Sequence, residues 1–407
     1  MKITGIKTRI VAVPFKQFAS ESKLRSETKT TIGVLTEVMT DEGLVGLGEG
    51  APPLGAAHTK NLIDAAAPQL IGENPLHVNR IMKMVYARFN LTHLHIHAAN
   101  WALNGIEMAL WDLSARAANR PLCELWGGPF RNKIKFFGYI ERQEPEAMKA
   151  EAAKLVGMGF DTLYVKVGLG EVSDIEAVRA IREGASSRNV RIRVDANQAW
   201  TPDEAIRIIN AMTEFDLEFV DQPTLMYNLD AMERIRRSVS VPIAAHESGW
   251  TMYEMLNIVK RQAADVIHVD PRFDAGFTGA RISAGIAEAA GIPVVLHSYG
   301  ELGVAFAGCL HLAASCPNFS LANQGTSYRL LTDDIIKGGP LQFDVNKMAV
   351  PSGIGIGVQL DEDKVAVYEE YYQREVCVDG REKQLLTDAY AGMYFRPFFR
   401  DWGDEHK

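Results

Sequence analysis

TLYVKVG (162–168), RIRVDAN (191–197) and FVDQP (219–223) are short, mostly apolar stretches that end in polar side chains, and they decide the fold. PIAAHE (242–247), VIHVDP (266–271), PVVLHS (293–298) and FSLANQ (319–324) follow the same pattern. Runs rich in Val and Ile are typical of parallel strands buried on both faces. One polar residue near each end recurs at intervals of 29, 26, 26, 23, 27 and 26, from Lys166 to Asn323. The repeat predicts successive strands of one sheet.

Amphipathic stretches separate the predicted strands, and two of them carry a helix-start signal. TPDE (201–204) and TMYE (251–254) each place Glu three residues after a threonine, which is the capping box of a helix N-terminus. Strand, loop and helix units of about 25 residues predict an α/β fold, a (β/α) barrel of the TIM type with seven or eight units. Because the chemistry of such barrels lies at the C-terminal ends of the strands, the recurring polar residues form the candidate site.

The composition is that of a soluble globular protein. Of 407 residues, 47% are hydrophobic, and 43 basic against 51 acidic residues give a net charge of -8. That balance argues against nucleic acid or an anionic membrane as a partner. The four cysteines lack the paired spacing of metal or redox motifs, and no apolar run reaches the roughly 18–20 residues of a membrane span. We therefore expect a cytoplasmic protein with a small-molecule partner.

At 407 residues the chain exceeds one compact core of ordinary size, so we expect more than one unit. Alternating residues over 2–14 and 32–39 predict antiparallel strands, and helical patterns follow them up to residue 119. These segments predict an α+β capping domain over residues 1–125, ahead of the barrel over 126–355. Residues 356–407 hold a further helix and an aromatic tail. We expect that segment to pack back on the cap or on a neighbouring subunit of a homo-oligomer, from dimer to octamer.

Asp195, Asp221 and Glu247 end three consecutive predicted strands and should therefore converge. Three carboxylates suit a hard divalent cation such as Mg²⁺, which we expect at one per subunit. The alternative is that they are solvated acids at strand ends that cap helices. Side chains alternate along a strand, so only one of the neighbours His246 and Glu247 should point inward. The repeated interval of 26 residues favours Glu247.

Lys166 and His297 are the candidate acid–base residues on opposite walls. A divalent cation on a substrate carboxylate would stabilise the enediolate left by removal of the neighbouring proton, and Lys166 is a candidate base for that step. Alternatively, Lys166 is a structural lysine that pairs with Asp195. Asp270, on the strand before His297, can accept from one imidazole nitrogen and raise the basicity of the ring. We interpret His268, which faces inward below Asp270, as structural.

Further motifs carry a resemblance to a known family. They are GLVGLGEG (43–50), IEMALWDLSARAANRPLCELWGG (106–128), VKVG, VDANQAW, QPT and DAGFTGA (274–280). With these motifs in order, nearly all of residues 1–355 resembles the enolase superfamily, in the mandelate racemase and muconate lactonizing enzyme group. The resemblance implies metal carboxylates at Asp195, Asp221 and Glu247, and a lysine and a His–Asp pair as acid and base. Asp221 is a departure, since Glu is usual there.

Other positions also depart from the family pattern, and the resemblance implies altered substrate binding there. Tyr164 and Asn323 stand where the family often has a lysine and a glutamate near the substrate carboxylate, and we expect them to make neutral hydrogen bonds. Asn197 stands where some dehydratases carry a further histidine. Lys16 and Arg25, in the long polar segment after the first predicted strand, are candidate substrate-binding residues of a cap loop.

The predicted site supports several reactions on a small carboxylate. By resemblance, we expect dehydration of a sugar acid to a 2-keto acid, with one base removing the α-proton and the other protonating a departing β-hydroxyl. Racemisation or epimerisation, and cycloisomerisation of a lactone acid, use the same residues and stay open. A barrel that binds a small acid without turning it over is a further alternative, because two substrate-side positions have changed.

Overall fold

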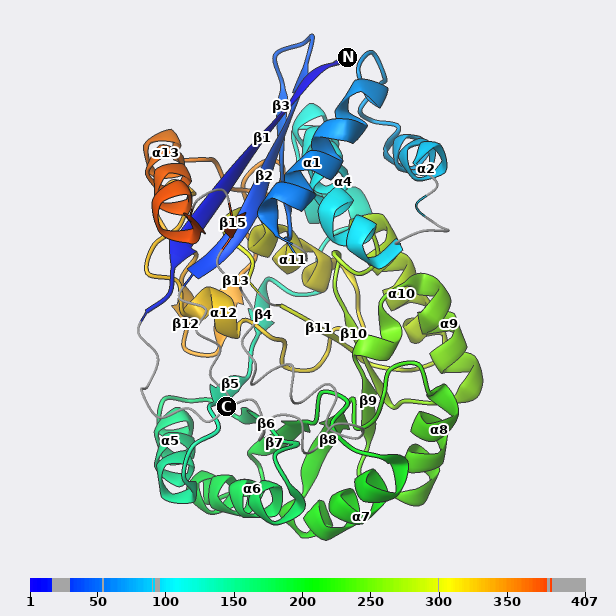
Figure 1. Cartoon of the computed structure of the whole chain (residues 1–407), viewed down its shortest axis with the longest axis vertical. Helices are drawn as coiled ribbons and strands as arrows, with labels where there is room; N and C mark the ends of the chain where they lie inside the picture. Colours follow the sequence, from blue (N-terminus) through cyan, green and yellow to red (C-terminus); the bar gives the residue numbers. More distant parts are fainter. Residues whose placement is uncertain are drawn as a thin grey trace.

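The computed structural model describes residues 1–16, 30–52, 55–89, 91, 96–298, 300–378 and 381–382. An N-terminal part of antiparallel strands and helices sits beside a curled parallel sheet that is ringed by helices (Figure 1). The predicted α/β barrel fold with an N-terminal α+β unit is confirmed. The domain limits stay a prediction.

The N-terminal part is a three-stranded antiparallel sheet, in the order β1-β2-β3, covered by helices. Its elements are β1 (Ile3–Pro14), β2 (Thr30–Thr40), β3 (Val45–Gly50), α1 (Ala56–Ala66), η1 (Ala67–Gln69), α2 (Val78–Arg88), α4 (Ile96–Ala117) and η2 (Leu122–Trp126). Leu110 of α4 shares a buried core with Val34 and Val38 of the sheet. The helix crosses the sheet so closely that a side chain at Gly48 would overlap the main chain of Gly105. This approach explains a glycine of the GLVGLGEG motif.

The barrel sheet is parallel and has the strand order β11-β10-β9-β8-β7-β6-β5. Its strands are β5 (Gly138–Ile140), β6 (Thr162–Lys166), β7 (Arg191–Asp195), β8 (Leu217–Asp221), β9 (Ile243–Ala245), β10 (Val266–Val269) and β11 (Val294–Leu296). The outer helices are α5 (Pro145–Gly157), α6 (Glu171–Ala185), α7 (Pro202–Met212), α8 (Leu229–Ser238), α9 (Met252–Arg261), α10 (Phe277–Ala289) and α11 (Gly303–Ser315), with the short turns η3 (Thr213–Phe215) and η4 (Glu247–Gly249). Lys166 pairs with Asp195, and Asp195 with Asp221, so three strand ends share one edge.

Asn323 lies between β11 and β5 and closes the barrel. Its main-chain oxygen accepts from Phe137 N at 3.1 Å, and Gln324 N donates to Leu296 O at 3.1 Å. Its side chain repeats the bridge, because Leu296 N donates to Asn323 Oδ1 at 2.8 Å and Asn323 Nδ2 donates to Lys135 O at 3.2 Å. One buried amide therefore satisfies main-chain groups of β11 and of the segment before β5, at the junction that we call the barrel seam.

The segment KFFGYI (135–140), which leads into the barrel, divides between two sheets. Lys135 pairs with Lys347 in a small antiparallel sheet, while only Gly138 to Ile140 pair with β6. The small sheet holds β4 (Lys133–Lys135), β13 (Lys347–Ala349) and β12 (Phe343–Asp344), and α12 (Thr326–Arg329) precedes it.

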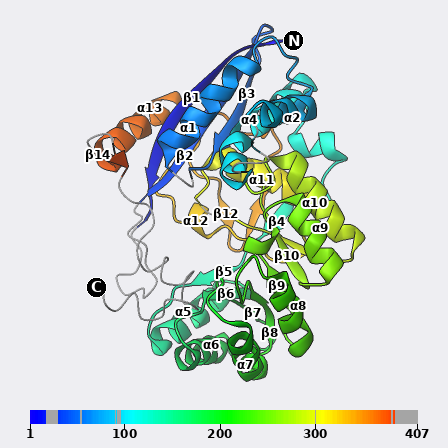
Figure 2. The same cartoon turned by 45° about the vertical axis from the view of Figure 1, so that its right-hand side comes forward.

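The described part of the C-terminal segment packs against the first strand of the cap. It consists of α13 (Glu362–Tyr371), η5 (Tyr372–Val376), β14 (Cys377–Val378) and β15 (Arg381–Glu382). Figure 2 shows α13 beside β1. Arg9 Nη1 donates to Glu362 Oε2 at 2.6 Å, while its Nη2 donates to Glu37 Oε1 at 2.7 Å. The guanidinium of β1 thus joins the sheet to the C-terminal helix.

Two buried carboxylates of the cap hold the barrel helices. Glu107, on α4, accepts from Phe277 N at 2.8 Å and Thr278 N at 2.9 Å, the first residues of α10. Glu49, on β3, accepts from main-chain N–H groups at the start of α11, at 2.8 and 3.0 Å. The first N–H groups of a helix have no partner within it, so a carboxylate there satisfies them and interacts favourably with the helix dipole. The cap and the barrel are consequently locked at two helix N-termini.

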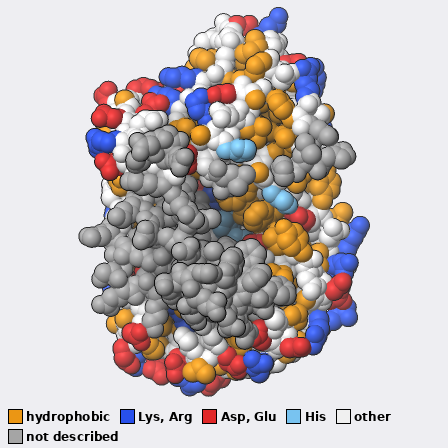
Figure 3. Space-filling model, viewed as in Figure 1, with side chains coloured by type: hydrophobic (Ala, Val, Ile, Leu, Met, Phe, Trp, Pro, Cys, Tyr) orange, Lys and Arg blue, Asp and Glu red, His pale blue; other side chains and the backbone are white. Residues whose placement is uncertain are grey.

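The outer helices are joined by surface ion pairs. Each adjacent pair from α5 to α9 has one: Lys149–Glu183, Arg207–Glu171, Arg234–Asp203 and Arg261–Asp230. Acidic and basic side chains are accordingly interspersed along the rim of the face in Figure 3. Exposed pairs of this kind contribute about 0–1 kcal/mol each.

Within the described residues, no helix is long and apolar enough to cross a membrane.

Candidate active site at the mouth of the barrel

Six of the recurring polar residues lie at or directly after the C-terminal ends of the barrel strands, whose arrangement Figure 1 shows. Lys166, Asp195 and Asp221 are the last residues of β6, β7 and β8, Glu247 follows β9 in η4, Asp270 follows β10, and His297 follows β11. None of these six residues is more than 9% exposed. Charged groups at this depth need partners, so their contacts reveal which groups act together.

Asp195 already has a full set of partners. Its Oδ2 accepts from Lys166 Nζ at 2.6 Å and from the Tyr164 hydroxyl, and its Oδ1 accepts from Asn197 N at 2.7 Å. Burial would raise the pKa of Asp195, but the Lys166 ammonium outweighs it and holds that pKa below its usual range. Asp195 is therefore an ionised acceptor for groups of the barrel itself.

Asp221 and Glu247 instead face two imidazoles. His268 Nε2 lies 2.8 Å from Asp221 Oδ2, and His246 Nδ1 lies 3.7 Å from Asp221 Oδ2 and 3.6 Å from Glu247 Oε2. The two imidazole rings stack, with centroids 4.5 Å apart. All four side chains are buried. We call Asp221, Glu247, His246 and His268 the imidazole–carboxylate cluster.

The inward position of His246 corrects the expectation that only Glu247 of this pair points into the site. Ala244 lies in the barrel interior with Phe219, Val266 and Val295, so alternation along β9 aims His246 into the site two residues later. The strand ends at Ala245, and the chain turns into η4, which brings Glu247 back to the same place. Alternation predicts directions only within a strand, and this strand stops one residue too early.

The cluster contains buried polar atoms without a hydrogen-bond partner among the described residues. They are both oxygens of Asp221, His246 Nδ1, Glu247 Oε2 and both ring nitrogens of His268. The pKa of Asp221 is raised well above its usual range by burial and by Asp195, whereas burial lowers the pKa of His268 to about 3. A cation satisfies such atoms and relieves the cost of burying an acid. Carboxylate oxygens and neutral imidazoles are metal ligands, so the residues present fit a divalent cation.

Lys166 is held by two acceptors on β7 and the loop after it. Besides Asp195, Lys166 Nζ contacts Asn197 Oδ1 at 2.5 Å. Asn197 Nδ2 in turn donates to Glu247 Oε1 at 3.0 Å. Asn197 thus links the ammonium to the cluster, and its positive φ of 41° turns the chain sharply enough to do so. The pairing of Lys166 with Asp195 is the alternative that the sequence left open, and it coexists with a position at the mouth.

His297 is backed by Asp270 and by aromatic rings. His297 Nδ1 lies 2.8 Å from Asp270 Oδ2. The Phe273 ring stacks on the His297 imidazole with ring centroids 5.1 Å apart, and the ring centroids of His246 and His297 are 4.4 Å apart. Burial, together with the nearby His246, lowers the pKa of His297 well below its usual value. An ionised Asp270 can only accept, so it fixes the proton on Nδ1 and leaves the Nε2 lone pair available.

Arg272 and Glu301 complete this network, and the sequence did not point to either. Arg272 Nε donates to Asp270 Oδ1 at 2.9 Å, and Arg272 Nη2 lies 2.7 Å from Glu301 Oε1. Burial would raise the pKa of Asp270, but the Arg272 guanidinium outweighs it and lowers that pKa. Arg272 comes two residues after Asp270 on the loop beyond β10, where strand alternation no longer predicts direction, so its position gave no signal in the sequence. Glu301 comes from the next loop and likewise gave no signal.

Lys166 and His297 belong to different walls. In the sheet order, β6 and β11 are separated by β7, β8, β9 and β10. Asp195, Asp221 and Glu247 follow the intervening strands. A ligand on the acidic residues would therefore have the amine on one side and the imidazole on the other.

The residues predicted to bind substrate lie in different surroundings. Tyr164 stacks on Phe137 at 4.5 Å, and burial raises the pKa of its hydroxyl well above the usual value, so it stays a proton donor to Asp195. Asn323 serves the barrel seam, and Lys16 is exposed near α12, with Nζ 3.5 Å from Arg329 O. Arg25 lies outside the described residues. Substrate contacts by these residues and by Asn197 stay predictions.

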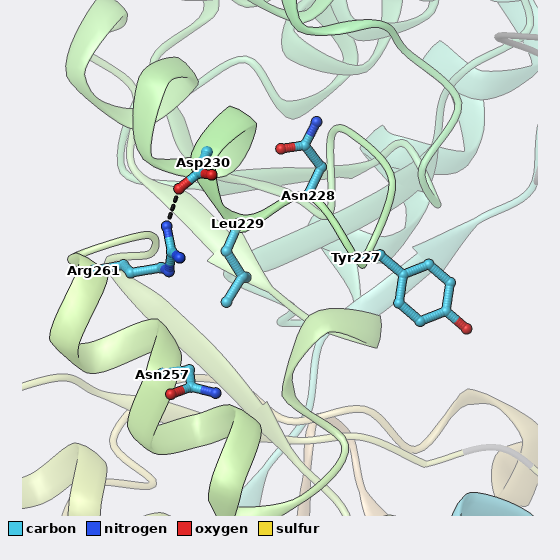
Figure 4. A pocket seen from close by; sticks show the side chains of 6 residues that line it. All are labelled: Tyr227, Asn228, Leu229, Asp230, Asn257 and Arg261. Atoms are coloured by element: carbon cyan, nitrogen blue, oxygen red, sulfur yellow. Dashed lines mark hydrogen bonds and ion pairs between the residues drawn. The ribbon is translucent and has the colours of Figure 1, made fainter.

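A separate hollow of about 250 Å³ opens on the outer surface at α8 and α9 (Figure 4). It is lined by Tyr227, Asn228, Leu229, Asp230, Asn257 and Arg261. Its two charged side chains, Asp230 and Arg261, neutralise each other in an ion pair. None of the predicted site residues lines it, so we place the chemistry at the strand ends.

Two family models match the chain. The model described as Enolase C-terminal domain-like matches residues 147–364, and the model described as Mandelate racemase / muconate lactonizing enzyme, N-terminal domain matches residues 6–127. Together they span the cap and the barrel strands that carry the site.

Similar proteins include enzymes of different reaction types. A hydrophobic dipeptide epimerase from Enterococcus faecalis is 31% identical over 352 residues, covering 83% of this chain and 97% of the relative. An arabinonate dehydratase from Saccharolobus solfataricus is 29% identical, covering 83% of this chain and 90% of the relative. A crystal structure of the Enterococcus faecalis dipeptide epimerase, complexed with Mg and the dipeptide L-Leu-L-Tyr, has a TM-score of 0.80 at 28% identity, covering 88% of this chain and 100% of that one.

Proposed function

The chain belongs to the mandelate racemase / muconate lactonizing enzyme family of the enolase superfamily, and from that premise we propose a metal-dependent enzyme that removes the proton next to a carboxylate. One observation carries the proposal: Lys166 and His297 lie on separate walls, with the acidic residues between them. These acidic residues would hold the divalent cation, which the sequence predicts to be one Mg²⁺ per subunit, and the ion would stabilise the negative charge that develops on the substrate carboxylate.

His297 and Lys166 take complementary roles in the proposal. His297 is neutral and backed by Asp270, so its Nε2 accepts the α-proton of the substrate. Lys166 contacts the ionised Asp195, which favours the ammonium form and makes Lys166 a proton donor on the opposite side. Arg272 keeps Asp270 ionised, so Asp270 orients the imidazole and stabilises it once it is protonated.

Dehydration of a sugar or hydroxy acid to a 2-keto acid fits an unlike pair of this kind. His297 takes the α-proton, and Lys166 protonates the departing β-hydroxyl, which leaves as water. The similarity to the arabinonate dehydratase supports this choice.

Racemisation or epimerisation is the second candidate. There Lys166 returns a proton to the opposite face of the same carbon, and no leaving group is needed. The similarity to the dipeptide epimerase supports this reading equally.

Exchange of the α-proton with solvent tests both candidates. The protein, loaded with Mg²⁺ or Mn²⁺, is incubated in D₂O with aldonic acids, dipeptides and N-acylated amino acids, and ¹H NMR records loss of the α-proton. Exchange with release of a 2-keto acid supports dehydration, and exchange with inversion supports epimerisation.

Substitutions test the roles of His297 and Lys166 in the exchange reaction. His297→Asn and Lys166→Ala should each lower the rate by about 10²–10⁴-fold, while the exposed His58→Asn should not change it. Binding of an acid without exchange across the library would overturn the proposal in favour of a non-catalytic barrel. Wild-type rates in His297→Asn would remove that residue from the reaction.

A further inference from the structure

The imidazole–carboxylate cluster differs from the ligand set that the sequence predicts. The sequence pattern groups Asp195, Asp221 and Glu247, three hard oxygen ligands. In the structure, both oxygens of Asp195 are bonded, to Lys166, Tyr164 and a main-chain N–H group. Recruiting Asp195 to a cation would therefore compete with the ammonium that the chemistry places at the mouth.

The imidazoles of His246 and His268 supply the further candidate ligand atoms. One ring nitrogen each of His246 and His268 and one oxygen of Asp221 all lie within 4.8 Å of one another, and Asp221 Oδ2 lies 3.7 Å from His246 Nδ1 and 2.8 Å from His268 Nε2. Ligand atoms on one ion at about 2.1 Å lie up to about 4.2 Å apart, so small side-chain adjustments bring all three onto a common ion. Glu247 Oε2, at 3.6 Å from His246 Nδ1, supplies a second carboxylate oxygen.

These atoms point at one another without satisfying one another. His268 is 2% exposed and His246 is 6% exposed, yet the nitrogens that face the acids have no hydrogen-bond partner among the described residues. The 2.8 Å approach of His268 Nε2 to Asp221 Oδ2 lacks hydrogen-bond geometry. Native proteins rarely leave several buried polar groups unpaired in one place, and an ion satisfies all of them together.

We propose that the imidazole–carboxylate cluster binds a first-row transition cation, of the Mn²⁺ to Zn²⁺ class, with both imidazoles as ligands and without Asp195. Imidazole nitrogen suits these ions, whereas Mg²⁺ prefers oxygen ligands and gives up its water reluctantly. The inference refines the cation of the proposed function and rests on a cation being bound at that site. Asp195 stays with Lys166 and Tyr164, so the acid–base group and the metal ligands are separate sets.

Spectroscopy of the metal-loaded protein tests nitrogen ligation without any substrate. Chelator-stripped protein is loaded with Mn²⁺ or Cu²⁺, and electron spin echo or continuous-wave EPR spectra are searched for ¹⁴N coupling. Coupling to two imidazole nitrogens is expected. A spectrum with oxygen ligands alone would overturn the inference, whatever the exchange assay of the proposed function gives.

Calorimetric titrations of substituted proteins separate the cation classes. His246→Asn and His268→Asn each replace a ring nitrogen by an amide oxygen, which Mg²⁺ accepts at least as well as a ring nitrogen. Affinity for Co²⁺ or Zn²⁺ should fall by more than about 100-fold, because loss of even an outer-shell partner costs about 10–100-fold. Affinity for Mg²⁺ should change by less than about 3-fold, and His58→Asn is the matched control.

Asp195→Asn completes the design. It should weaken Co²⁺ binding less than either imidazole substitution does. The inference fails if Asp195→Asn abolishes metal binding while both imidazole variants keep wild-type affinity, or if the imidazole variants lose Mg²⁺ and Co²⁺ affinity equally. Circular dichroism confirms that each variant is folded, and the wild-type EPR spectrum decides the question if one is not.

Discussion

Gly276 and Gly285, nine residues apart in and beside α10, should respond to the same substitution with opposite signs. Gly276 precedes the helix with φ 122° and ψ -173°, a region that is essentially restricted to glycine. A Cβ at Gly276 would fall within 3.0 Å of three atoms of the Glu107 side chain. Gly285 lies inside α10 and is exposed, and nothing lies within 4 Å of a Cβ there.

The two costs at Gly276 add. The backbone conformation costs about 1–3 kcal/mol for a residue with a side chain. Displacement of Glu107 weakens its hydrogen bonds to Phe277 N and Thr278 N, which contribute about 0.5–1.5 kcal/mol each and so about 1–3 kcal/mol together. Gly276→Ala should therefore lower the free energy of unfolding by about 2–6 kcal/mol. Gly285→Ala should raise it by about 0.5–1 kcal/mol, because alanine is the better helix former.

Urea unfolding followed by tryptophan fluorescence measures both variants, and hydrogen–deuterium exchange reads the site directly. Exchange of the amides of Phe277 and Thr278 should accelerate in Gly276→Ala and stay at the wild-type rate in Gly285→Ala. The cost of Glu107→Ala and Gly276→Ala together should be smaller than the sum of the single costs, since both act on one contact. A Gly276→Ala protein within 1 kcal/mol of wild type, with unchanged exchange, would refute the reasoning.

Two further predictions concern buried groups away from the cluster. Burial lowers the pKa of His311 from 6.5 to about 4, so as the pH falls the unfolded chain binds a proton at this residue before the folded protein does. The free energy of unfolding should therefore fall by roughly 3 kcal/mol between pH 6.5 and pH 4. In urea titrations at several pH values, His311→Gln should reduce this acid-dependent loss, whereas the exposed His58→Gln should leave it unchanged. Asn323→Ala should lower the free energy of unfolding by about 2–4 kcal/mol, because Leu296 N and other buried groups of the barrel seam lose their hydrogen-bond partner. An unfolding free energy equal to that of the exposed Asn61→Ala would show that the seam does not need the Asn323 amide.

The spacing of polar residues in the sequence was enough to predict the barrel. Parallel strands that are buried on both faces are mostly apolar, so polar residues concentrate where the strands end. Lys166, Asp195 and Asp221 are indeed the last residues of β6, β7 and β8. Asn323 belongs to the same repeat, but its bonds to Leu296 and Lys135 across the closing junction of the barrel could not be predicted from spacing along the chain.

The position of His246 shows where alternation fails. The rule of two faces predicts one inward residue from His246 and Glu247, but β9 ends at Ala245 and the following turn changes the direction. His268 faces inward as the alternation predicts, yet its approach to Asp221 on a strand two places away could not be read from the sequence.

The sequence by itself determined which chemical groups stand at the ends of the strands, because hydrophobic burial fixes the strands and their spacing. Only the tertiary structure decided which of those groups are partners. It assigned Asp195 to Lys166 and Tyr164, and it turned Asp221 and Glu247 towards two imidazoles. The physical reason is that electrostatic and hydrogen-bond partnerships depend on distances of a few ångströms across the barrel, which no periodicity along the chain encodes.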